Sequence, residues 1–225
     1  MNLKCRIIEL YSSPTKFFSS IRSDLTCGLL IVTMCGGLTF LSGIMVNGKL
    51  AILAGENSSL SQPEIDRMKT IYLCVVPTLN VIIGSLVMGL SIYILSAFKG
   101  GYGGLIDSLT ISFMSYAALL PYFIVSALFH LFYVNTSFVM NPSNRSMAIG
   151  LLTNLTLLYQ KSSPLGYSRF LIYLAFSLWQ LSLLIVGVRE VHKLSTAWSI
   201  LTVFLSIGLL SLISRYVTLT VMLML

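Results

Sequence analysis

The chain has 225 residues, of which 56% are hydrophobic and 9% are charged. A soluble domain carries about 25% charged residues because its surface must face water. The composition therefore excludes an ordinary soluble protein and predicts a surface that faces lipid. The net charge of +7 comes from Lys and Arg residues that stand singly beside apolar runs. Nucleic-acid binding needs a basic stripe on one face, so we expect no nucleic-acid partner.

Residues 1–24 form a leader before the first apolar run. The pair Ser13-Pro14 suits the N-cap and first positions of a helix. The apolar face of that helix would consist of Phe17, Phe18 and Ile21. The pattern predicts a short N-terminal interfacial helix lying on the membrane, with an ordinary leader into the first span as the alternative. The next run lacks a small-x-small cleavage site and is too long for a signal peptide, so we expect it to be retained.

Five apolar runs are long enough to cross a membrane, since a span needs about 20 apolar residues. They lie at residues 25–46, 71–98, 105–133, 170–188 and 197–222. The predicted fold class is an all-α integral membrane protein, with a bundle of five transmembrane helices over residues 25–225. Pro77 and Pro121 interrupt the second and third runs. If these two helices are antiparallel, both kinks fall at a similar level.

Small residues follow helical spacing in two of these spans. Ser108, Ser112 and Ser115 share one face of the third span. Ser85 and Gly89 form a small-xxx-small pair on the second. Such faces let helices approach closely and exchange hydrogen bonds in lipid, so we expect them to pack inside the bundle.

The connections between spans differ in length. Those at residues 47–70 and 135–169 are long and polar, whereas those at 99–104 and 189–196 are tight. Lys and Arg beside the first span favour a cytosolic N-terminus, which places the long loops and the C-terminus outside. No separate domain outside the membrane is expected. Four N-x-S/T sequons fall in the long loops and are candidate glycosylation sites: Asn57, Asn135, Asn144 and Asn154.

Three ionisable residues lie within the predicted spans, where such residues are candidates for function. Asp107 lies near the start of the third span, and His130 lies near its far end. Their separation in the sequence corresponds to about 34 Å along a helix, so the two side chains cannot form one site. Arg215 reaches the headgroup level, where its side chain can extend to water. His130 remains the candidate intramembrane ionisable group.

No set of catalytic, cofactor-binding or metal-binding residues emerges from the sequence. It contains no G-x-S-x-G, H-E-x-x-H or phosphate-binding loop, and the predicted topology places His130 and His192 at opposite membrane faces. The four cysteines lack a C-x-x-C spacing and fit free thiols that act as small apolar residues. We therefore expect no cofactor and no enzymatic activity.

Three segments, in order along the chain, carry a family resemblance. The first is Pro14 followed by Phe17 and Phe18. The second is Gly100-Gly101-Tyr102-Gly103-Gly104, leading into a span with Tyr116, Ala117 and Pro121. The third is Trp179, then Gly187-Val188-Arg189-Glu190-Val191-His192-Lys193-Leu194-Ser195 and Ala197. Together they resemble the Yip domain family, the Ypt-interacting membrane proteins.

The resemblance implies a five-helix bundle with a cytosolic N-terminus and an outer C-terminus. Eukaryotic relatives are similar in being adaptors for small GTPases in vesicle traffic. Here the cytosolic region is reduced to the leader, and Gly104 and Leu105 stand where the family usually has an aromatic residue and a serine. These departures argue against a GTPase partner. They favour a short prokaryotic-type member in a cell membrane, with the ER or Golgi as the alternative.

The glycine turn and the charged turn are predicted on the same membrane face, where they would form one cluster. Its members are Gly100, Gly101, Gly103, Asp107, Arg189, Glu190 and His192. We expect opposite charges there to pair, together with Lys99, and to offer a docking site for a membrane protein or an anionic lipid headgroup. The predicted function is to organise membrane partners or lipids. The alternatives are a small-solute or ion transporter and, more weakly, a membrane enzyme acting on lipid headgroups.

Overall fold

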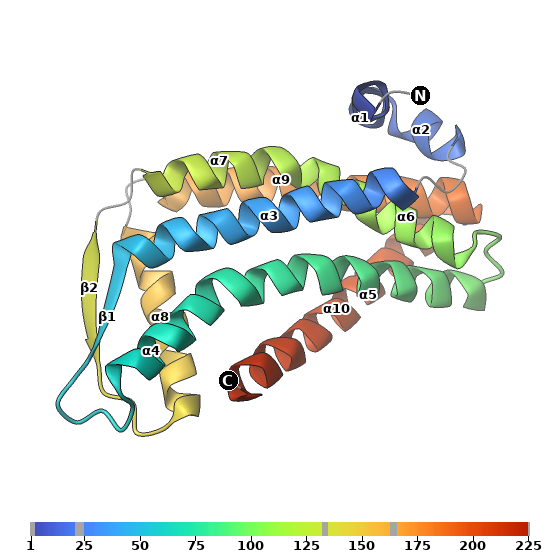
Figure 1. The fold of residues 1–225 in the computed structure, drawn as a ribbon. Coiled ribbons are helices and arrows are strands. Elements are labelled where there is room, and N and C mark those ends of the chain that lie inside the picture. The colour runs from blue at the N-terminus through green and yellow to red at the C-terminus, as the bar shows by residue number, and fades with distance from the viewer. Residues whose placement is uncertain (1–2, 21–24, 132–134, 163–165, 225) are drawn as a thin grey trace.

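The computed structural model describes residues 3–20, 25–131, 135–162 and 166–224 and has the form of an elongated helical bundle (Figure 1). Five helical segments are long and apolar enough to cross a membrane: Leu25–Lys49, Gln62–Phe98, Leu105–Leu131, Tyr167–His192 and Thr196–Tyr216. They coincide with the five predicted spans. The predicted fold class is therefore confirmed, although a short sheet and further helices accompany the spans.

The elements follow one another with short connections. In chain order they are α1 (Leu3–Ser12), α2 (Pro14–Ser20), α3 (Leu25–Lys49), β1 (Leu50–Ala54), α4 (Gln62–Thr70), η1 (Ile71–Val75), α5 (Val76–Phe98), α6 (Leu105–Ser115), η2 (Tyr116–Leu119), α7 (Leu120–Leu131), β2 (Thr136–Met140), α8 (Arg145–Ser162), α9 (Gly166–His192) and α10 (Thr196–Met224). The second span consists of α4, η1 and α5, and the third consists of α6, η2 and α7.

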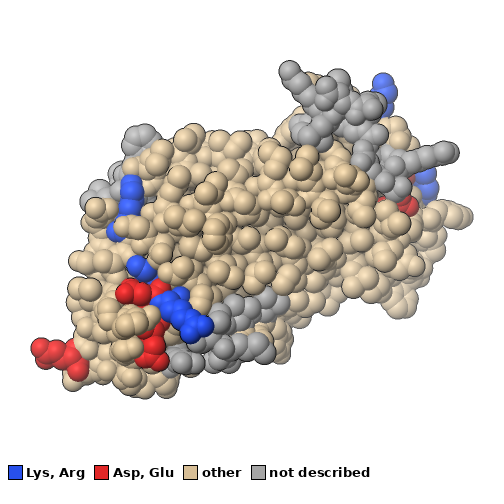
Figure 2. All heavy atoms as spheres, in the orientation of Figure 1, with Lys and Arg blue, Asp and Glu red and all other residues tan. Residues whose placement is uncertain are grey.

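The bundle has two different ends (Figure 1). The turn end carries α1, α2 and the connections α5–α6 and α9–α10, and the cap end carries β1, β2, α4 and α8. In the view of Figure 2, the charged side chains of the described residues gather near these ends, and uncharged side chains cover the length between them. Large apolar side chains such as Leu29, Leu86 and Phe204 are exposed along that length. Such a belt suits a lipid bilayer.

Both span prolines interrupt the regular helix that contains them. The π-helical turn η1 precedes Pro77, and the 3-10 turn η2 precedes Pro121. Each proline lies in the part of its span that is farther from the connection between Phe98 and Leu105. Counted along the two helices from that connection, the breaks differ by only about 8 Å in depth, so they lie at the similar level expected from the sequence.

A proline in a helix leaves the carbonyl four residues before it without its regular donor, and that carbonyl must find another partner in lipid. For Pro121 this is the Ala117 carbonyl, which accepts from the Leu120 N–H of the 3-10 turn and from the Tyr11 hydroxyl of α1. The neighbouring Tyr116 carbonyl accepts from the Cys35 thiol, with Sγ and O 3.6 Å apart. Burial raises the pKa of Tyr11, so its phenol keeps the proton that it donates.

For Pro77 the corresponding carbonyl is that of Leu73, in the π-helical turn. Here α3 crosses at Gly43, where an added Cβ would overlap the Leu73 carbonyl oxygen and lie 2.8 Å from Cys74 Cα. Glycine therefore lets α3 approach the interrupted segment of the second span more closely than any other residue could.

The predicted N-terminal helix is present as α2, but its aromatic face does not lie on the membrane. Phe17 and Phe18 are 2% and 1% exposed. Their rings pack edge to face, with centroids 5.3 Å apart, and a Cβ added at Gly187 of α9 would lie 3.2 Å from the Phe18 ring. The leader is thus fastened to the bundle through α9. Ile21, the third residue of the predicted face, is outside the described residues.

The small-residue faces pack inside the bundle, where the third span meets the second and the fourth. Ser85, Ser108, Ser112 and Ser115 are fully buried. The Ser112 hydroxyl donates to the Ser85 carbonyl across the two helices at 2.7 Å. A Cβ added at Gly89 would lie 2.8 Å from Leu109 Cα, so glycine sets the close approach of α5 and α6.

The two long connections fold into a cap with its own core, whereas the sequence analysis treated them as polar loops. The buried residues of this core are Val46, Leu50, Ile52, Ile65, Met68, Leu73, Cys74, Val76, Met140, Ala148 and Leu152. Within the cap, β1 and β2 pair in parallel, with Leu50 opposite Thr136 and Ala54 opposite Met140. The direction follows from the spans, because α3 and α7 both run toward the cap end and deliver the two strands side by side (Figure 1).

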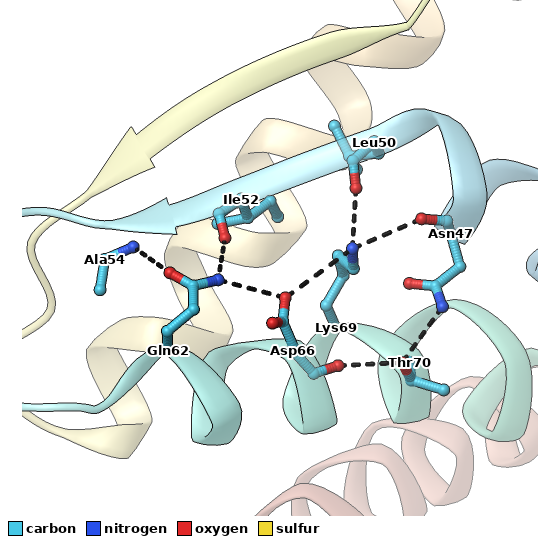
Figure 3. Close-up of polar contacts among 8 residues, drawn as sticks. All are labelled: Asn47, Leu50, Ile52, Ala54, Gln62, Asp66, Lys69 and Thr70. Carbon is cyan, nitrogen blue, oxygen red and sulfur yellow. Dashed lines mark hydrogen bonds and ion pairs between the residues drawn. The ribbon is translucent and has the colours of Figure 1, made fainter.

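Polar side chains of α4 complete the cap (Figure 3). The amide of Gln62 accepts from the Ala54 N–H at 2.7 Å and donates to the Ile52 carbonyl at 2.8 Å, so it pairs with the edge of β1 as a further strand would. Lys69 is buried, and its ammonium donates to the Leu50 carbonyl at 2.8 Å and to the Asn47 carbonyl at 3.4 Å. A cation at these carbonyls favours the C-terminus of α3.

Candidate functional site

The structure places the glycine turn and the charged turn in contact at the turn end. We call their residues the turn cluster: Gly100, Gly101, Gly103, Asp107, Arg189, Glu190 and His192. The N–H of Tyr102, within the glycine turn, donates to the His192 carbonyl at 3.3 Å. His192 Nε2 lies 2.9 Å from Ser108 Oγ, and the side chain is 1% exposed. His192 is therefore the buried centre of the cluster.

The hydrogen bonds around Ser108 favour the tautomer of His192 that carries its proton on Nε2. The Ser108 hydroxyl donates to the Gly104 carbonyl at 3.1 Å, so its oxygen is left to accept from His192 Nε2–H. A neutral imidazole then has its lone pair on Nδ1. That atom is buried and has no hydrogen-bond partner among the described residues. His192 acts as a neutral packing and hydrogen-bonding group in this arrangement.

The glycines leave room for the imidazole. A Cβ added at Gly103 would lie 2.8 Å from two atoms of the His192 ring, and one added at Gly101 would lie 3.1 Å from its Cβ. Gly100 has a φ of 77°, a conformation that side-chain-bearing residues rarely adopt. The Gly101 N–H donates to the Ser96 carbonyl at 2.9 Å and closes the turn on α5. The shape of the glycine turn is thus fixed from both sides.

The expected ion pairs between the two turns are not formed among the described residues. Glu190 pairs instead with its neighbour Arg189, with Oε1 and Nη2 2.7 Å apart. Asp107 accepts from the Gly104 N–H at 2.9 Å and caps its own helix. Lys99 lies 4.0 Å from the centre of the Trp198 ring, a cation–π contact between α5 and α10. The turns are joined by His192 rather than by charge.

An exposed rim of aromatic and basic side chains surrounds the buried centre. Phe98 and Tyr102 are 85% and 87% exposed. Lys99 and Lys193 are exposed beside them, and Arg189 is half-buried. Aromatic residues and arginine are enriched at protein interfaces, and aromatic and basic residues occur together at the headgroup level of membranes. The rim therefore has the composition of a contact surface.

The segments that carry the family resemblance converge at the turn end, although they are far apart in the sequence. Phe18 of the first segment packs against Gly187 of the third. The glycine turn of the second segment contacts His192 of the third. These contacts give a physical reason for the three patterns to occur together.

His130 lies at the cap end, far from the turn cluster, as its position along the third span predicts. Its Nε2 is 3.0 Å from Arg169 Nη1 of α9. An arginine can only donate, so this nitrogen accepts and the neutral imidazole carries its proton on Nδ1. Arg169 ends the segment predicted from the sequence to be a long polar loop, whereas in the structure it lies within α9. The pair joins two different spans, and periodicity alone does not relate such positions.

A cleft of about 700 Å³ lies between α9 and α10, over α3, α5 and α7. The two bounding helices diverge from their shared turn toward the cap end (Figure 1). A neighbouring hollow of about 360 Å³ adds His130 and Thr218 at the cap end. Both hollows are lined by Thr39, Ser42, Pro77, Asn80 and Arg169. The cleft is thus polar near the cap, where it adjoins the hollow that contains the Arg169–His130 pair.

The other predicted site residues lie apart from both sites. Asn57, Asn135, Asn144 and Asn154 are all exposed in the cap. Asn144 also caps α8, because its Oδ1 accepts from the Met147 N–H at 2.8 Å. Arg215 is exposed on α10. Among the described residues, no three His, Cys, Asp or Glu side chains are grouped so that they could hold a metal ion.

A family model of the Yip1 domain matches residues 8–215 of the chain. The match includes most of the leader, the cap and all of the turn cluster, and it confirms the resemblance drawn from the three segments. No curated protein and no solved structure is significantly similar to the chain.

Proposed function

This chain belongs to the Yip1 domain family and is an integral membrane protein with five apolar spans, and from these facts we propose that it is a non-enzymatic organiser of membrane partners or lipids. The turn end serves as its docking platform. We place this end and the N-terminus in the cytosol and the cap and C-terminus outside, in the cell membrane of a prokaryote. A GTPase is not among the partners that we propose.

The observation that carries the proposal is the fixed shape of the turn cluster beneath an exposed rim. His192 is enclosed by Ser108, Gly101 and Gly103, so the two turns cannot move independently without breaking buried contacts. A surface that is ordered before binding loses less conformational entropy when a partner docks. The exposed Phe98 and Tyr102 supply apolar area, and the lysines supply charge for an acidic partner or an anionic headgroup.

Site-specific photo-cross-linking tests the platform. A photoreactive phenylalanine is placed at Tyr102, on the rim, and separately at Val139, which is 65% exposed at the cap end. We expect protein adducts in native membranes at Tyr102, few at Val139, and fewer at Tyr102 when His192→Ala loosens the turns. Equal adducts at the two ends, or none at Tyr102 in correctly inserted protein, would contradict the proposal.

The alternative function, a small-solute or ion transporter, is favoured by the cleft and its Arg169–His130 pair. Transport needs a path across the membrane, and the test is solute or proton flux in proteoliposomes. A flux that His130→Ala abolishes with expression unchanged would place transport above the organising function. We expect no such flux.

A further inference from the structure

The cleft between α9 and α10 changes from polar to apolar along its length. On α9 it is lined by Leu178, Gln180 and a set of residues that follow helical spacing on one face: Arg169, Tyr173, Ser177, Leu181 and Leu184. The face begins with a cation near the cap end and ends with leucines deep in the membrane, about 22 Å further along the helix. Ile207 and Leu210 of α10 and Met88 of α5 line the deep part opposite these leucines.

Hydroxyl groups at the polar part of the cleft lack partners. Ser42 Oγ and Ser177 Oγ are buried and have no hydrogen-bond partner among the described residues. A buried polar group left without a partner costs about 1–3 kcal/mol. Both residues line the cleft: Ser42 also lines the neighbouring hollow with Asn80 and Arg169, and Ser177 lies about 12 Å beyond Arg169 along α9. A ligand that has an anionic group and further acceptor oxygens along its length would place negative charge beside the arginine and satisfy these hydroxyls.

The cleft is closed toward the turn end. Ile92 lies one helical turn beyond Met88 on α5, and Val188 lies one turn beyond Leu184 on α9. Ile92 and Val188 are fully buried in the hydrophobic core of the bundle, together with Ile111. A hollow that is polar at the headgroup level and ends blindly among apolar side chains has the shape of a site for an amphiphile. Its volume is within the roughly 300–1,000 Å³ of small-molecule sites.

We propose that this cleft binds one phospholipid of the leaflet at the cap end. The anionic phosphate lies at Arg169, the ester oxygens that follow it reach the deeper serine hydroxyl, and one acyl chain follows the α9 face to Leu184. The chain enters from the bilayer between the diverging α9 and α10. The site is at the opposite end from the docking platform, so the two proposals can fail separately.

Native mass spectrometry of the full chain in detergent tests the site with four added probes. They are phosphatidylglycerol, diacylglycerol with the same acyl chains, glycerol 3-phosphate and inorganic phosphate. We expect one phosphatidylglycerol per chain and at least ten-fold weaker binding of diacylglycerol. Neither soluble phosphate should protect the protein against thermal unfolding.

Three variants separate the headgroup from the acyl chain. Arg169→Ala should weaken phosphatidylglycerol binding at least ten-fold, whereas Arg215→Ala, which removes an exposed cation from α10, should leave it unchanged. Ser177→Phe keeps Arg169 and fills the cleft, and it should exclude both lipids. Equal binding by the two arginine variants, binding by Ser177→Phe or absence of a phosphatidylglycerol adduct would overturn the lipid site. Protection by inorganic phosphate equal to that by the lipid would indicate a free-anion site instead.

Discussion

Tyr11 and Pro121 are coupled through a single carbonyl group, although they lie in the leader and the third span. The proline removes the regular donor to the Ala117 carbonyl, which accepts instead from the Leu120 N–H of the 3-10 turn and from the tyrosine hydroxyl. Prolines in the spans could be recognised from the sequence, and so could the need to satisfy the carbonyls that they release. The donor itself could not be identified from the sequence, because it depends on where α1 packs in three dimensions.

The first prediction concerns this coupling. Tyr11→Phe should lower the free energy of unfolding by about 1 kcal/mol, since the Ala117 carbonyl loses one of its two donors. In a Pro121→Ala background the restored N–H can bond to the Ala117 carbonyl, so the same change should cost less. Thermal unfolding in detergent measures this double-mutant cycle, with the exposed Tyr102→Phe as the control. An equal cost of Tyr11→Phe in both backgrounds would show that the two residues are not coupled.

The second prediction concerns the space around His192. Gly103→Ala should destabilise the protein by about 1–3 kcal/mol, because the added methyl would overlap the imidazole and displace a turn. Gly37→Ala is the matched control, since an added Cβ there meets no atom within 4 Å. Combining Gly103→Ala with His192→Ala should recover part of the loss, because the smaller side chain leaves room for the methyl. If Gly103→Ala is as stable as Gly37→Ala, the turns are not held together as described.

At the scale of elements, the spans could be predicted from apolar length alone, whereas the cap could not. Two local signals for the cap were nevertheless present in the sequence. Ser61 and Glu64 have the spacing of a capping box, and the Glu64 carboxylate accepts from the Ser61 N–H at 2.9 Å at the start of α4. Asn144 precedes α8, and its own side-chain oxygen accepts from the Met147 N–H. The strands gave no comparable signal, because β1 continues the apolar run of α3 and pairs with a segment that follows two further spans in the sequence.

The third prediction tests the polar contacts that hold the cap. Lys69→Ala should lower the free energy of unfolding by about 1–3 kcal/mol, because the Leu50 and Asn47 carbonyls lose their donor. Arg67→Ala removes the same charge from the exposed face of α4 and should change stability by less than about 0.5 kcal/mol. Thermal unfolding of both variants in the same detergent makes the comparison. Equal losses would mean that Lys69 contributes by its charge alone.

The turn cluster illustrates what could be predicted of the candidate site. The topology indicated that the two turns share one membrane face, and the structure places them in contact. The charges of Glu190, Asp107 and Lys99 suggested ion pairs between the turns, but each finds a nearer partner on its own or a neighbouring element. A sequence shows which charges reach a surface, whereas the orientation of each side chain decides how they pair.

At the scale of the whole molecule, the turn end and the cap end differ in their connections, in their exposed side chains and in their relation to the cleft. The turn end has short connections, a rigid centre and an aromatic and basic rim, whereas the cap end has a folded cover with the four sequons. The cleft opens toward the cap end and is closed toward the other. The orientation of the protein in the membrane therefore decides which side each activity faces, because docking and lipid binding are assigned to opposite ends.

Cysteine labelling in intact cells tests this orientation most directly. In a background without the four native cysteines, Tyr102→Cys marks the turn end and Val139→Cys marks the cap end, both at exposed positions. A membrane-impermeant maleimide should label Val139→Cys in intact cells and Tyr102→Cys only after permeabilisation. The reverse pattern would put the turn cluster outside the cell, beyond the reach of cytosolic partners, and would contradict the proposed docking function.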